Sequence, residues 1–295
     1  MHRRIESAMT MMTDPRHFKL RLFIEGNIIG VATGMVIALF RYLLELSEEY
    51  LPVLYRWLPE HIAWIPVWFL ALFLCSWVLY RIVSKDGMTS GSGIPQIKGI
   101  LLGEMDMNWA RVLVLKFTGA VLGIGAGMSL GREGPSVQLG ACLGQGLGRL
   151  THRSYAESHY LLTAGAGAGL AAAFNAPLAG VIFCLEELTK NFSAFVLMGA
   201  ISAAVTATTV TQYFFGMQPV FHMGVVPVID TGHMYFLLIL LGAFVGLLGL
   251  AFNPMLTRSQ DFYKKVPARW RPVVPLFCAG VLGFVLPQVL GGGSR

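Results

Sequence analysis

Long apolar stretches alternate with short polar ones along most of the chain. Each of seven stretches is close to the roughly 20 residues that a helix needs to cross the hydrocarbon of a bilayer. They are residues 22–46, 62–80, 111–130, 155–185, 193–215, 233–256 and 272–290. Glycines recur at spacings such as Gly165 to Gly169, which let helices approach closely in lipid. The pattern predicts an all-α, multi-pass membrane protein, with the lipid bilayer as its surroundings.

Composition and charge support the same prediction. Of 295 residues, 55% are hydrophobic and 13% are charged, whereas a soluble domain is about one-quarter charged. The net charge of +6 does not indicate a nucleic-acid partner, because basic residues precede the first apolar stretch and acidic residues follow it. The basic residues are Arg3, Arg4, Arg16, Lys19 and Arg21, and the acidic ones are Glu45, Glu48, Glu49 and Glu60. This alternation predicts a cytoplasmic N-terminus.

The four cysteines carry no metal or disulfide signature. Cys75, Cys142, Cys184 and Cys278 lie in or beside apolar stretches without paired spacing. We expect buried thiols, no metal site and no cofactor.

A polar tail (residues 1–20) and one membrane domain (residues 21–295) describe the chain most simply. Within that domain, 30-GVATGMVIALF-40 resembles 242-GAFVGLLGLAF-252. Chance similarity of two glycine-rich helices is the alternative to a true repeat. A true repeat is typical of transporters built from two structural repeats. The first would cover about 21–216 and the second about 232–295, and the second would end before it supplied its own copies of the motifs below.

The segment 91-GSGIP-95 interrupts the apolar pattern. Glycines and a proline are unfavourable inside a helix, so the segment predicts unwound backbone followed by a helix with Pro95 in its first turn. Ser92 would then lie at a helix N-terminus, where free N–H groups and the helix dipole attract an anion. The alternative is that Ser92 only caps the helix.

A second break, 130-LGREGPSVQLGA-141, places Glu133 at another helix start within an apolar region. Irregular backbone at membrane depth is tolerated only where protein buries it or where it lines a cavity. A carboxylate there would accept the N–H bonds that a bound anion would accept, and protonation would release it. Acids at membrane depth are functional candidates, although an ion pair between Glu133 and Arg132 is the alternative.

The third cluster is 174-FNAPLAGVIFCLEEL-188. Pro177 and Gly180 begin another helix, and Glu186 and Glu187 follow nearly two turns later, pointing about 100° apart. One of them could face the interior while the other meets a basic partner such as Lys190. The alternative is a solvated helix end.

The stretch 127-GMSLG-131 matches the nucleophile elbow of hydrolases. That motif requires a strand before the serine and supporting acid and histidine residues. Because an apolar helix is expected before Ser129, we do not expect an enzyme.

Taken in order, the three motifs GSGIP, GREGP and AFNAPLAG…EE resemble the CLC family of chloride channels and chloride/proton exchangers. The resemblance runs from about residue 20 to the end of the chain. It implies a fold of broken and re-entrant helices, with the first inverted repeat and the start of the second. It also implies that Ser92 coordinates the central anion and that Glu133 is the external gate. Backbone at Gly93, Arg132 and Gly134 would help to hold anions.

The resemblance further implies the class of transport. Exchangers of the family carry an internal proton-transfer acid at the position of Glu187, which channels commonly lack. Fluoride-transporting relatives usually change the residues at Ser92 and Pro135, so their retention favours chloride. A second-half anion loop and a late tyrosine of the family are not found, so we expect a truncated chain.

The expected function is therefore proton-coupled chloride antiport across the cell membrane, with chloride and protons as the transported ions. A homodimer is expected by the same resemblance. The alternatives are a passive voltage- or pH-gated chloride channel and a truncated subunit that does not transport.

Overall fold

The computed structural model describes residues 15–217 and 232–292, and their regular elements are all helices. The predicted all-α fold class is confirmed. The longer helices, in chain order, are α2 (Pro15–Trp57), α3 (Ile65–Lys85), α4 (Ile94–Leu102), α5 (Trp109–Gly125), α6 (Glu133–Leu150), α7 (Tyr155–Phe174), α8 (Pro177–Phe183), α9 (Ala194–Phe215), α10 (Gly232–Lys265) and α11 (Val273–Val285). A π-helical turn, η4 (Cys184–Thr189), continues α8.

Five of the seven predicted stretches correspond to helices long and apolar enough to cross a membrane. These segments are His17–Glu60, Ile62–Lys85, Ala194–Phe215, Tyr235–Lys265 and Ala268–Val285. The other two predicted stretches differ. Residues 111–130 contribute most of α5 and then a loop, and residues 155–185 break at Asn175, which has a positive φ of 58°. Broken helices of this kind agree with the interruptions that the glycines and prolines predict.

The N-terminal boundary also differs from the expected tail at residues 1–20. Helix α2 already begins at Pro15, and Phe18 is buried against Tyr160 and Phe195. Aromatic packing of Phe18 therefore holds the start of α2 against α7 and α9.

Glycine contacts bring the central helices unusually close together. A methyl group on Gly140 of α6 would collide with the Gly165 carbonyl of α7, and the reverse substitution would collide with the Gly140 carbonyl. Gly30 and Gly34 of α2 also lie close to α9, where a methyl group on Gly30 would lie 2.7 Å from the Ala203 oxygen. The small-residue spacing in the sequence therefore marks real helix contacts, as expected for packing in lipid.

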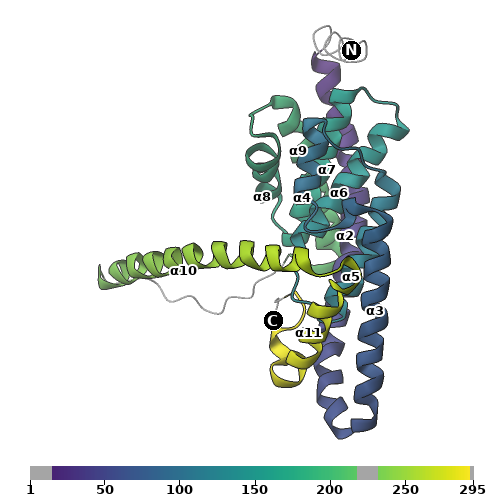
Figure 1. Cartoon of the computed structure of the whole chain (residues 1–295). Coiled ribbons are helices and arrows are strands. Elements are labelled where there is room, and N and C mark those ends of the chain that lie inside the picture. The colour runs from purple at the N-terminus through teal and green to yellow at the C-terminus, as the bar shows by residue number, and fades with distance from the viewer. Residues whose placement is uncertain (1–14, 218–231, 293–295) are drawn as a thin grey trace.

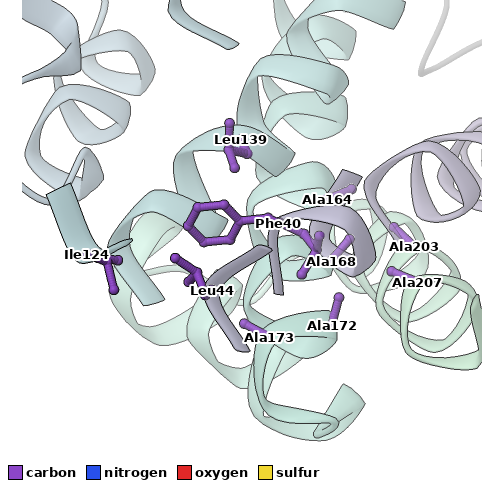
Figure 2. Close-up of a cluster of buried hydrophobic side chains, with 11 residues drawn as sticks. Phe40, Leu44, Ile124, Leu139, Ala164, Ala168, Ala172, Ala173, Ala203 and Ala207 are labelled. Carbon is purple, nitrogen blue, oxygen red and sulfur yellow. The ribbon is translucent and has the colours of Figure 1, made fainter. Parts of the chain in front are cut away.

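A compact core lies where α2, α5, α6, α7 and α9 meet (Figure 2). Phe40 fills its centre, with Leu44 beside it on α2 and Leu139 approaching from α6. Alanines of α7 and α9 complete the walls. Large side chains on one helix against small ones on its neighbours fill the space without separating the backbones.

Helix α10 is packed very differently from the rest of the chain. It projects away from the helical bundle (Figure 1), and no residue of its most apolar 18-residue segment is buried. Gly242 and Gly246 have no neighbouring atom within 4 Å of an added methyl group, unlike Gly30 and Gly34. On α11, Cys278 is exposed rather than buried as expected.

We predict that Gly165→Ala destabilises the protein, because the obstacle to the methyl group is backbone and no side-chain rotation can relieve it. Such overpacking costs about 1–3 kcal/mol. The matched variant Gly242→Ala meets nothing within 4 Å and should be neutral or slightly stabilising, since alanine favours helix. Thermal unfolding in detergent measures both variants, and equal melting temperatures would contradict the packing argument.

Candidate functional site

The first predicted break forms as a 3₁₀ turn, η3 (Gly87–Thr89), followed by irregular backbone at residues 90–93 that leads into α4. We call residues 87–93 the unwound segment. Gly91 and Gly93 take positive φ angles of 65° and 91°, and Pro95 lies in the first turn of the helix. These left-handed conformations favour glycine because it has no Cβ. The predicted helix start after GSGIP is confirmed, with Gly93 as the residue that precedes the helix.

Three side chains bind the four consecutive backbone carbonyls of residues 88–91. They belong to α4, α5 and α6, so three helices converge on one unwound segment. Gln138 Nε2 donates to Met88 O at 2.7 Å, Lys116 Nζ to Thr89 O at 3.2 Å and to Gly91 O at 2.6 Å, and Gln96 Nε2 to Ser90 O at 2.8 Å. These bonds satisfy backbone acceptors that no regular helix satisfies at this break. They also fix the orientation of the backbone that carries Ser92.

Ser92 lies exposed at the end of this segment. Its Oγ accepts a long hydrogen bond of 3.4 Å from the Ile94 amide. Ser92 therefore caps α4 weakly, as the alternative interpretation expects. An anion at the same helix start would meet the hydroxyl and the free amides of the first turn of α4.

The second predicted break brings a second helix start to Ser92. Helix α6 begins at Glu133, as predicted. A methyl group on Gly134 would lie 2.7 Å from the Ser92 carbonyl oxygen and 2.9 Å from its Cβ. The N-terminal turns of α4 and α6 therefore touch, although 40 residues separate the two motifs in sequence. Two positive helix ends at one place form an electrostatic environment that favours negative charge.

Glu133 is half-buried at this junction. Its carboxylate folds back over Gly131, where a methyl group would collide with Glu133 Oε2. Within the described ranges, no ion pair joins Glu133 to Arg132. The ion-pair alternative is therefore not seen, and the carboxylate stays beside the start of its own helix.

Glu187 lies on the exposed π-helical turn η4, away from the helix junction. Its carboxylate forms a short ion pair with Lys98 of α4 rather than with the expected neighbour Lys190. About half of the Glu187 side chain is exposed, at 49%, which agrees with the solvated-end alternative. The hydrogen bond and charge of Lys98 lower the pKa of the Glu187 carboxyl, and Lys190 adds to this.

Sequence reasoning missed the side chains that hold the unwound segment. Lys116 is 5% exposed, and a lone lysine within the apolar stretch 111–130 was a usable signal, because such residues commonly pair with backbone carbonyls. Gln96 and Gln138 gave no comparable signal, since glutamines also occur on ordinary helix surfaces. Beside these residues, a cavity of about 660 Å³ extends from Gly91 and Lys116 toward Pro272.

A known protein family matches the part of the chain that contains these residues. A family model described as the voltage-gated chloride channel matches residues 70–295. The chain belongs to the voltage-gated chloride channel (CLC) family. The matched region contains both helix starts and η4, so this family membership covers the whole candidate site.

Individual relatives are exchangers. The H(+)/Cl(-) exchange transporter ClcA of Vibrio cholerae serotype O1 is 36% identical over 283 residues, covering 90% of this chain and 59% of that protein. ClcA of Salmonella paratyphi B is 33% identical, covering 93% and 60%. The CLC chain thus spans about three-fifths of the length of these curated relatives.

Solved structures share the fold. A slow cyanobacterial Cl⁻/H⁺ antiporter superposes with a TM-score of 0.83 at 29% identity, covering 93% of this chain and 66% of that one. A CLC-type fluoride/proton antiporter superposes with a TM-score of 0.75 at 26% identity, covering 92% and 67%.

We predict that Gly134→Ala weakens anion binding by roughly tenfold or more, since misplacing a site by about 1 Å is costly. The methyl group would press on Ser92 and push the two helix starts apart. Calorimetric titration of the detergent-purified protein with chloride measures the effect. Gly87→Ala, which meets nothing within 4 Å, is the control. Equal affinities in the two variants would contradict a site at the α4–α6 junction.

Proposed function

We propose that this protein carries chloride across the membrane in exchange for protons, with Glu133 as the gate and Glu187 as the internal proton-transfer acid. The single observation that carries the proposal is the contact between the starts of α4 and α6 at Ser92 and Gly134. Family membership and the exchangers among the relatives support it.

The anion site follows from the geometry of this contact. A dehydrated chloride ion needs positive partial charge on several sides, and two converging helix starts supply amide groups without a fixed full charge. Ser92 contributes a hydroxyl, while Gly93, Arg132 and Gly134 contribute backbone. Because the carbonyls of residues 88–91 are already bound by donors, they do not turn toward the ion and repel it.

Gating follows from the position of Glu133 on α6. An ionised carboxylate at a helix start competes with a mobile anion for the same amides. Protonation removes that competition, because a neutral carboxyl is a weaker acceptor. External protons and chloride then act on one side chain, which is the requirement for linking their movements.

Glu187 supports exchange over passive conduction. It is an acid on an exposed turn, so protons from the aqueous phase can reach it without crossing the core. The basic residues before α2 and in its first two turns support a cytoplasmic N-terminus in the cell membrane, and we further propose a homodimer.

Glu133→Gln should make chloride flux largely insensitive to external pH, because the amide mimics the protonated gate permanently. Chloride efflux from liposomes, measured over a range of external pH, tests this. Glu60→Gln, at an exposed acid outside the junction, should keep the wild-type pH dependence. Unchanged pH dependence in Glu133→Gln would overturn the gate assignment.

Glu187→Gln should uncouple protons from chloride while leaving chloride flux. The test is whether an imposed chloride gradient drives uphill proton movement in liposomes. Glu186→Gln on the same turn is the matched control and should retain proton pumping. Pumping that survives Glu187→Gln would remove Glu187 from the proton route, and wild-type protein that never pumps protons would be a passive channel.

A further inference from the structure

Helix α4 connects the two ends of the proposed mechanism. Its start carries Gly93 beside the anion site, and Lys98 follows five residues later, about 7 Å along the helix axis. Lys98 Nζ donates a hydrogen bond to Glu187 Oε1, and this ion pair joins α4 to η4. One short helix therefore carries the proposed anion site at its start and contacts the proposed proton-transfer acid through Lys98.

Stability alone does not account for this pair. Its side chains are 32% and 49% exposed, and ion pairs with this degree of exposure contribute little to folding free energy. The hydrophobic contacts of Ile97 and Leu188 already hold α4 against this region, in a shared buried cluster. A charged contact at a partly solvated edge has more influence on protonation than on packing.

We propose that Lys98 is a positioning residue for proton transfer, whose ammonium group holds the Glu187 carboxylate against α4 and competes with the incoming proton for it. This inference rests on the proposed role of Glu187. Binding of a proton to the carboxylate neutralises it and ends the ion pair, and loss of the proton restores the pair. One carboxyl O–H bond forms when the proton arrives from water and breaks when the proton returns to water, and no further reactant is needed.

The charges around Glu187 are few. Lys98 acts from α4 and Lys190 from the end of η4, and both lower the pKa of the Glu187 carboxyl. Glu186 is the adjacent acid. Three further helices pack against η4. Helix α8 has no ionisable side chain, and the only one on α9 is Tyr213. The ionisable side chains of α7 lie in its first two turns. Those of α7 are Tyr155, Glu157, His159 and Tyr160.

The sign of the expected effect follows from these charges. Because Lys98 lowers the pKa of Glu187, removing its charge should raise that pKa and let the carboxyl take up a proton at higher pH. Lys98→Arg keeps the charge and should keep the wild-type value. A merely structural role for Lys98 would change stability but would leave the titration in place.

The direct test is infrared difference spectroscopy of the purified protein, with the Glu187→Gln variant used to identify the Glu187 carboxyl band. Lys98→Met should shift the titration midpoint of that band upward, whereas Lys98→Arg and the matched control Lys85→Met should not. An unshifted midpoint in Lys98→Met would overturn the proposal. The band reports on the carboxyl itself, so this measurement does not require transport.

The functional readout is the pH profile of proton-coupled flux in liposomes. Lys98→Met should move the midpoint of proton flux to higher internal pH, and Lys98→Arg should restore it. If Glu187→Gln uncouples transport but Lys98→Met leaves both midpoints unchanged, the positioning role fails and the exchanger assignment stands. If Glu187→Gln leaves coupling intact, the proposed role of Glu187 itself fails.

Discussion

The site depends on how the structure satisfies backbone groups where the helices are broken. An unwound segment at membrane depth exposes carbonyls that lipid cannot bind, and each unsatisfied group costs several kcal/mol. Here Gln96, Lys116 and Gln138 bind the four carbonyls of residues 88–91. The same bonds that make the break tolerable also fix which way its amides face. Folding and the proposed anion recognition therefore depend on the same hydrogen bonds in this segment.

Close helix packing also fixes the position of the second motif, GREGP, at the start of α6. Gly140 and Gly165 let α6 lie directly on α7, and Gly134 lets the first turn of α6 lie directly on Ser92. Gln138, one turn later on α6, both packs against Gly93 and binds the unwound segment. Larger residues at these glycines would separate the two helix starts, and each would then be an ordinary capped helix end. Small residues are thus part of the proposed anion site although they supply no side chain to it.

Local chemistry in the sequence predicts the helix starts but not the long-range contacts. Glycine and proline at GSGIP and GREGP restrict the backbone directly, so the starts of α4 and α6 follow from neighbouring residues. The partners of Lys98 and Lys116 depend on how helices far apart in sequence come together, and no local pattern contains that information. Lys190 was the nearer candidate for Glu187, but its own positive φ of 53° ends the turn, while α4 brings Lys98 alongside. The exposed Cys278 has the same explanation, because burial depends on what packs against α11.

The two acids differ in a way that suits opposite tasks. Glu133 stands at a helix start, so in the proposed mechanism its charge would be linked to chloride. Glu187 stands on an exposed turn beside Lys98, so in the proposed mechanism its charge would be linked to the aqueous proton concentration. Helix α4 is the element common to both, with Ser92 and Gly93 at its start and Lys98 on its side. A helix of nine residues is short enough to move as a unit. In the proposed mechanism, a change at either acid would therefore act on the other through the position of α4.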